Sequence, residues 1–341
     1  MTTPLRTATR LARPCLHSPR FFTSAAPPSA RSSRQLLILG ASFALLGAGS
    51  AAYLAASRVP VLALDAPAGS HPLQASKTVI SASAAPGSTA VVATGNASVP
   101  TLPLTLALPN GTEYTLVGFG VRTVSFLRIQ VYVAGYYVAT ADLPRLAAAL
   151  IDATTTTSAT DSSTSGTPRS LLLPGAERSA LQAQLLDGAA SDALWDGVLE
   201  CAGVRSLFRV TPVRDTDFHH LRDGFVRAIQ ARTRPGGPPQ WAFGDAGFVD
   251  AMADFRAIFA RGKVPKQKEL LLIREADGEL RVLYDDGTTG GRVDLGGVKD
   301  ERVSRMLWLN WLGGKNVASE AARKSISEGL MDLVARPIGS V

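Results

Sequence analysis

The sequence is poor in the residues that build metal and disulfide sites. Its 341 residues include only two cysteines, Cys15 and Cys201, and four histidines. Two distant thiols do not make a disulfide framework, and they cannot supply the paired cysteines of a zinc finger. The sequence also lacks a phosphate-binding loop, a dinucleotide fingerprint and a G-x-S-x-G nucleophile elbow. These absences exclude small disulfide scaffolds, zinc fingers and several common classes of nucleotide-dependent and hydrolytic enzymes.

Acidic residues are absent from the first 64 positions. The first 58 residues instead contain seven arginines and no lysine: Arg6, Arg10, Arg13, Arg20, Arg31, Arg34 and Arg58. These seven account for the whole formal net charge of +7, so the rest of the chain has no positive excess to neutralise nucleic acid, and we expect no nucleic-acid partner. An acid-free start rich in Arg, Ser and Thr is typical of a mitochondrial transit peptide, which we predict over residues 1–34.

One long uncharged run follows the arginine-rich start. Residues 36–56 are 21 residues without a charge, which as a helix would span about 31 Å at ~1.5 Å per residue and cross a bilayer. More arginines precede this run than follow it, so the positive-inside rule predicts a single-pass inner-membrane protein whose bulk lies in the intermembrane space. Residues 59–101 are rich in Pro, Ala, Ser and Thr, which is typical of a linker.

A folded domain is expected over residues 102–335, with strands at both ends and helices between them. Alternating apolar residues and Asn-Gly or Asp-Gly turns predict two hairpins, and capping residues with helical periodicity predict the helices. Strands are expected at 102–108, 113–117, 121–138, 204–213, 270–275, 279–284 and 292–295, and helices at 142–151, 177–201, 215–232, 248–260, 301–312 and 320–334. This order favours an α+β fold. Residues 152–169 are a Thr/Ser-rich insert that we predict to be a loop.

Arg122 is the unusual residue of the predicted strands. Its permanently charged guanidinium lies among apolar residues, directly after a Gly118-Phe119-Gly120 segment that we interpret as a turn or bulge. Such a group needs an anionic or acceptor partner when it is buried. The partner could be a ligand carboxylate or an internal Asp or Glu, and strand alternation could instead turn Arg122 outward.

The segments around Arg122 resemble the chalcone isomerase-like family. The G-x-G-x-R strand at 118–122 and the strand at 126–138 are similar to two family strands, Arg222-Asp223-Gly224 to the middle helix, and residues 304–315 and 326–330 to the closing segment. The similarity is greatest to the family's fungal mitochondrial branch, the "altered inheritance of mitochondria" proteins. It implies an open-faced β-sandwich, in which a helical layer covers a large antiparallel sheet and a ligand cleft lies between them.

The resemblance also implies roles for four residues. Family enzymes hold a phenolate with an Arg, matched by Arg122, together with a Thr, a Tyr and an Asn. Tyr132 occupies the Thr position, as in the fatty-acid-binding branch, where an Arg and a Tyr hold a carboxylate. Phe218 and Phe225 replace the Tyr and the Asn. Two phenyl rings cannot donate hydrogen bonds to a cyclising substrate, so we expect a non-catalytic binding protein. Retained intramolecular lyase activity is the alternative.

The fungal branch further implies haem as the ligand, ahead of a fatty acid. On the helix expected at 215–232, Phe218 and Phe225 share the buried stripe, His219 flanks it and His220 points away. His219 is therefore the candidate axial ligand, unless it is an ordinary surface histidine. Covalent attachment is excluded because there is no C-x-x-C-H motif. A third interpretation is a structural membrane protein whose cleft is filled by its own side chains.

Overall fold

The structure is a computed structural model that describes residues 79–80, 90–124, 127–158, 175–233, 243–288 and 291–335. The predicted transit peptide (1–34) and membrane helix (36–56) lie outside these residues. Among the helices that are described, none is both long and apolar enough to cross a membrane.

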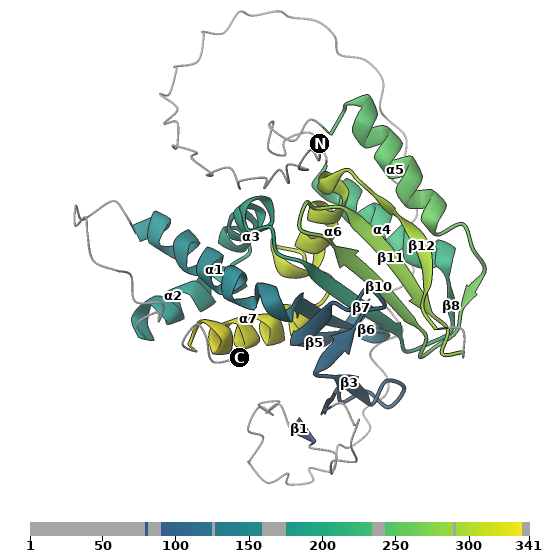
Figure 1. Cartoon of the computed structure of the whole chain (residues 1–341), viewed down its shortest axis with the longest axis horizontal. Coiled ribbons are helices and arrows are strands. Elements are labelled where there is room, and N and C mark those ends of the chain that lie inside the picture. The colour runs from purple at the N-terminus through teal and green to yellow at the C-terminus, as the bar shows by residue number, and fades with distance from the viewer. Residues whose placement is uncertain are drawn as a thin grey trace, which may run out of the picture. The chain divides into compact units, whose positions relative to one another are not determined.

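A seven-stranded antiparallel sheet forms the centre of the fold (Figure 1), with the strand order β12-β11-β10-β7-β6-β5-β4. Its strands are β4 (Thr105–Ala107), β5 (Glu113–Val124), β6 (Ile129–Ala139), β7 (Ser206–Pro212), β10 (Glu269–Arg274), β11 (Leu280–Asp285) and β12 (Val293–Val298). A three-stranded sheet is formed by β1 (Val79–Ile80), β2 (Val91–Ala93) and β3 (Thr101–Pro103), and a two-stranded one by β8 (Thr216–Asp217) and β9 (Lys263–Val264). The sequence predicted strands in all seven regions, and the hairpin β4–β5 has its predicted Asn-Gly turn. The predicted division of β5 and β6 is wrong, because β5 continues past Val117 to Val124 and β6 begins only at Ile129, so the predicted strand 121–138 spans the connection between them.

Helices form a layer against one face of the large sheet. They are α1 (Leu143–Ser158), α2 (Gly175–Leu186), α3 (Ala190–Cys201), α4 (Phe218–Arg232), α5 (Ala246–Ile258), α6 (Glu301–Leu312) and α7 (Glu320–Val334), and a short 3-10 turn, η1 (Thr140–Asp142), precedes α1. The largest hydrophobic cluster joins side chains of β6, β7, β10 and β11 to those of α4, α5, α6 and α7. The predicted α+β fold, with a large antiparallel sheet covered by helices, is therefore confirmed.

The predicted boundaries of the linker and of the Thr/Ser-rich loop also need correction. The linker predicted over 59–101 is too long, because β2 and β3 lie within the fold and Val92 and Val99 are buried. The loop predicted over 152–169 is also wrong at its start, since α1 continues to Ser158. Thr is a weaker helix former than Ala, but the apolar first half of α1 nucleates a helix that can extend into the polar run. Residues 159–174 lie outside the described part of the chain.

Two glycines let α7 pack directly on β5. A Cβ atom on Gly118 would lie 2.4 Å from the backbone nitrogen of Ile326, and one on Gly120 would lie 2.2 Å from that of Ala322. The register of β5 against β6 shifts between Leu116 and Gly118, which agrees with the bulge expected there. This close approach fixes the end of β5, where Arg122 lies.

Candidate functional site

Arg122 and Tyr132 form the first part of the site. They are directly opposite each other in the register of β5 and β6, so their side chains share the face of the sheet that the helices cover. The guanidinium carbon of Arg122 lies 5.7 Å from the centroid of the Tyr132 ring, within the range of a cation–π contact. Nowhere in the described structure does a carboxylate pair with Arg122. The sequence left open that Arg122 pairs with an internal Asp or Glu, or that it points outward. In the part of the chain that the structure describes, Arg122 does neither, because it faces Tyr132.

The hydroxyl of Tyr132 is buried and lacks a partner. The residue is 4% exposed, and within the described residues its Oη atom accepts or donates no hydrogen bond. Burial raises the pKa of Tyr132, while the charge of Arg122 and the Arg122 and Trp311 donor groups that face the hydroxyl lower it by a smaller amount. The phenol therefore keeps its proton at neutral pH and is available as a hydrogen-bond donor.

Trp311, on α6, completes the surroundings of that hydroxyl and was not identified from the sequence. Its indole lies close enough to Tyr132 to affect the pKa of the phenol. The indole stacks on Phe208 with ring centroids 4.3 Å apart, and its buried Nε1–H has no hydrogen-bond partner among the described residues. The available signal was the pair of tryptophans three residues apart on one helix, because a buried indole N–H normally finds a partner.

Phe218 and Phe225 are buried on α4, as the sequence predicted. Phe225 contacts Trp311, with ring centroids 5.8 Å apart, so two of the predicted site residues, Tyr132 and Phe225, lie beside Trp311, and Arg122 contacts Tyr132. Phe218 lies farther along the helix and contacts Phe259 and Tyr284 instead. Neither phenyl ring can donate or accept a proton. The polar groups at the centre of the site can all donate hydrogen bonds, and they suit the binding of an anion more than acid–base chemistry.

His219 and His220 are both exposed on α4. The residues do not fit an enclosed haem, because the one candidate axial ligand faces outward while the adjacent Phe218 and Phe225 are packed against other rings. No group of three or more His, Cys, Asp or Glu side chains within the described residues could hold a metal ion. An axial role for His219 stays a prediction, and on this structure it would place haem at the outer surface of α4.

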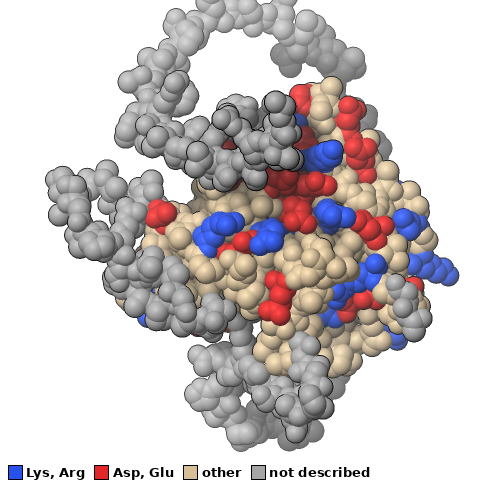
Figure 2. Space-filling model, viewed as in Figure 1, with Lys and Arg blue, Asp and Glu red and all other residues tan. Residues whose placement is uncertain are grey.

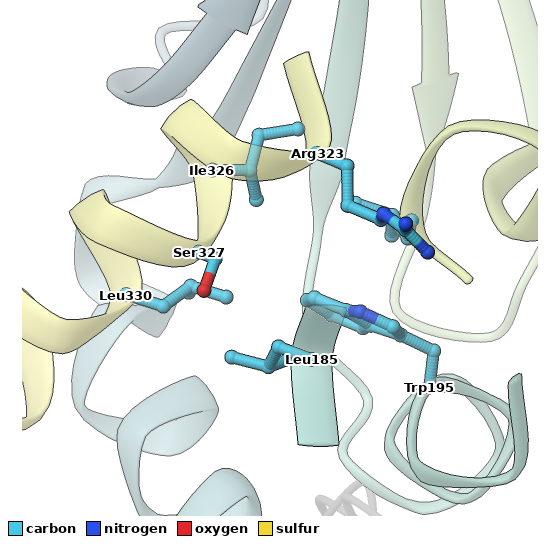
Figure 3. A pocket seen from close by; sticks show the side chains of 7 residues that line it. Leu185, Trp195, Arg323, Ile326, Ser327 and Leu330 are labelled. Atoms are coloured by element: carbon cyan, nitrogen blue, oxygen red, sulfur yellow. The ribbon is translucent and has the colours of Figure 1, made fainter. Parts of the chain in front are cut away.

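The apolar interior beside the site is closely packed. The space between α2, α3, α6 and α7 is lined by Leu185, Trp195, Leu312, Arg323, Ile326, Ser327 and Leu330 (Figure 3). It is too narrow to admit a water molecule. Here the protein's own side chains fill the interior. A ligand with a long apolar tail would have to displace some of them.

The two chain neighbours of Arg122 line a hollow at the surface. Arg122 is half-buried, and its chain neighbours Val121 and Thr123 border an open hollow of about 450 Å³. The other side of this hollow is the segment 317–321, which leads into α7. Ser319, the N-cap of α7, donates a 2.8 Å hydrogen bond from Oγ to the carbonyl of Val121.

Comparisons with known proteins agree with the motifs. A family model described as "Chalcone isomerase like" matches residues 112–327. Fungal proteins named "Altered inheritance of mitochondria protein 18, mitochondrial" are similar: that of Eremothecium gossypii is 32% identical over 228 residues (67% of this chain, 69% of the relative), and that of Debaryomyces hansenii is 31% identical over 224 residues (65% and 68%). The protein of this name from Saccharomyces cerevisiae is 29% identical over 243 residues (70% and 71%).

Among solved structures, the crystal structure of an Arabidopsis thaliana fatty-acid binding protein aligns with a TM-score of 0.45 and 17% identity, covering 68% of this chain and 100% of that one. The family model spans well over half of the chain, and the predicted resemblance is confirmed. The chain belongs to the chalcone isomerase-like family.

Proposed function

We propose that this protein is a non-catalytic, mitochondrial binding protein for a hydrophobic ligand that carries a carboxylate, with fatty acids as the ligand class. The observation that carries the proposal is the Arg122–Tyr132 pair. Arg122 has no carboxylate partner in the described residues, and the Tyr132 hydroxyl beside it is a buried donor without an acceptor. A ligand carboxylate would satisfy both groups at once.

The two buried phenylalanines of α4 argue against catalysis. An intramolecular lyase must hold the developing charge and a proton donor in place while the ring closes. Phe218 and Phe225 supply only hydrocarbon at the two positions concerned. Retained lyase activity is therefore the alternative that the experiments below must exclude, by incubation of the purified protein with a chalcone.

A mitochondrial location is part of the proposal. The fungal relatives are named mitochondrial, and the predicted transit peptide (1–34) and membrane helix (36–56) would place the binding domain at the inner membrane. A binding site for fatty acids at a membrane surface would exchange ligand with the bilayer. The arginines that precede residue 36 predict that the binding domain lies on the intermembrane-space side of that membrane.

The test is a titration of the purified full chain with sodium dodecanoate. We expect binding by the natural sequence, and about 10- to 150-fold weaker binding by the Arg122→Ala variant, since a hydrogen bond to a charged group contributes about 1.5–3 kcal/mol. Arg227→Ala is the matched control, because Arg227 is an exposed arginine on α4. Equal affinities of the Arg122→Ala variant and the natural sequence would reject the proposal.

The same purified protein can be used to test whether haem or a fatty acid is the ligand. Haem added to the protein should give no His219-dependent Soret band if the ligand is a fatty acid. A band that is present in the natural sequence, lost in His219→Ala and kept in His220→Ala would replace the fatty-acid proposal with axial haem binding at the surface of α4.

A further inference from the structure

The region around Tyr132 holds a third donor that the family resemblance does not assign. Arg122 comes from β5, Tyr132 from β6 and Trp311 from α6, and all three side chains meet at the Tyr132 hydroxyl. Tyr132 Oη and Trp311 Nε1 are both buried. Trp311 faces the hydroxyl, but neither atom makes a hydrogen bond of ordinary length and angle in the described part of the chain. No carboxylate acts on the hydroxyl from any described element packed against it.

The neighbouring tryptophan on the same helix shows that this is not a general property of α6. Trp308 is as deeply buried as Trp311, yet its Nε1–H donates a 2.8 Å hydrogen bond to Ser206 Oγ. An unpartnered donor in the protein interior costs roughly 1–3 kcal/mol. Arg122 is a half-buried arginine without a carboxylate partner among the described residues, and it contacts the same Tyr132 that Trp311 faces.

From this coincidence we infer that Trp311 donates its indole N–H to the ligand headgroup, together with Arg122 and Tyr132, and that the site therefore selects ionised carboxylates. The inference rests on the proposed function and deepens it. A carboxylate offers two oxygens with about four lone-pair sites and a full negative charge, enough for three donors. A methyl ester, an alcohol or a primary amide carries no negative charge for Arg122.

The experiment compares Trp311→Phe with Trp308→Phe in the full chain, with dodecanoate as the probe. Phenylalanine keeps the stacking on Phe208 and the contact with Phe225 but removes the N–H. We expect Trp311→Phe to bind dodecanoate about tenfold more weakly. Trp308→Phe should bind normally, although it is less stable because Ser206 loses a donor. Methyl dodecanoate should bind more weakly than dodecanoate to the natural sequence and should be insensitive to Trp311→Phe.

A measurement on the unaltered chain keeps the inference testable if a variant does not fold. The chain has four tryptophans and hence four indole N–H resonances in a ¹⁵N–¹H spectrum. Dodecanoate should move one of them downfield, whereas methyl dodecanoate should not.

Two results would overturn the inference. One is that Trp311→Phe binds dodecanoate normally while Arg122→Ala binds it weakly. This result would reject the role of Trp311 but leave the proposed function intact. The other is dodecanoate binding without any downfield indole shift. Normal affinity in Arg122→Ala would instead reject the proposed function itself.

Discussion

Asp196 on α3 is a single residue whose titration should be visible in the stability of the whole domain. Its side chain is 19% exposed and lies 3.3 Å from Arg305, measured between carboxylate and guanidinium. Burial raises the pKa of Asp196 to about 6, an effect that the charge of Arg305 only partly offsets and that nearby Glu200 and Asp192 reinforce. The folded state therefore binds a proton more tightly than the unfolded chain does.

The sign of the pH dependence follows from that difference. Between the unfolded pKa near 3.8 and the folded pKa of about 6, the folded state holds more protons, so the free energy of unfolding falls as pH rises through this window. We expect Asp196→Asn to raise the free energy of unfolding at pH 7.5 by about 1 kcal/mol and to leave it unchanged near pH 3.5. Denaturant titrations at the two pH values measure both. Asp254→Asn, at an exposed position on α5, is the control, and a loss of stability in Asp196→Asn at pH 7.5 would show that the pair with Arg305 outweighs burial.

The site residues differ in how far the sequence could predict them. Arg122 stood out because a permanent charge in an apolar strand is rare, and the family motif supplied Tyr132. Trp311 could not be found in the same way. All ten residues from Val303 to Leu312 are buried, so periodicity does not distinguish one face of α6 from another. Which indole has a partner depends on Ser206, which is 102 residues away in the sequence.

At the scale of elements, the contact between β5 and α7 depends on the absence of side chains. The Cβ of Gly120→Ala would lie 2.2 Å from the backbone nitrogen of Ala322, and backbone cannot rotate away as a side chain can. We expect this variant to lower the free energy of unfolding by about 3 kcal/mol or more, because either the helix must move or the strand must bend.

A second glycine provides the control. Gly197 lies on the exposed face of α3, and a Cβ there would meet nothing within 4 Å. Gly197→Ala should therefore raise the free energy of unfolding by about 0.5–1 kcal/mol, through helix propensity alone. Thermal unfolding of both variants tests the pair. If Gly120→Ala were as stable as the natural sequence, the close approach of α7 to β5 would not exist in solution.

The elements that the sequence predicted are those with strong local signals. Helix α4 begins at its Asp217 cap and α7 at its Ser319 cap, and the hairpin β10–β11 turns at Asp277-Gly278 as expected. The errors lie where local signals are weak. Strand β2 has three residues, of which only Val92 is buried, and so short a strand has no detectable alternation. Its place in the fold is decided by long-range contacts.

At the scale of the whole molecule, charge does not single out one surface. Lys and Arg side chains are interspersed with Asp and Glu over the visible face of the domain (Figure 2). This agrees with a chain whose formal excess of positive charge is confined to its first 58 residues. The electrostatic behaviour of the leader and of the folded domain should thus be separable, and so should their stabilities.

The boundary between leader and domain can be tested by truncation. Val92, Val99 and Leu102 are at most 5% exposed and form a cluster with Val133 and Val213 of the remaining domain. A chain that starts at residue 90 keeps this cluster, whereas one that starts at residue 104 exposes Val133 and Val213. Since burial of such a side chain contributes about 1.5–3 kcal/mol, we expect the shorter chain to unfold at a clearly lower denaturant concentration or to be insoluble.

The chain from residue 90 should unfold at the same denaturant concentration as one from residue 75, because the two differ mainly by a Ser- and Ala-rich segment and the two-residue strand β1. If the chains that start at residues 90 and 104 unfolded at the same denaturant concentration, residues 90–103 would belong to the linker, as the sequence predicted. If the chain from residue 90 unfolded at a much lower denaturant concentration than the chain from residue 75, the domain boundary would instead lie before residue 90.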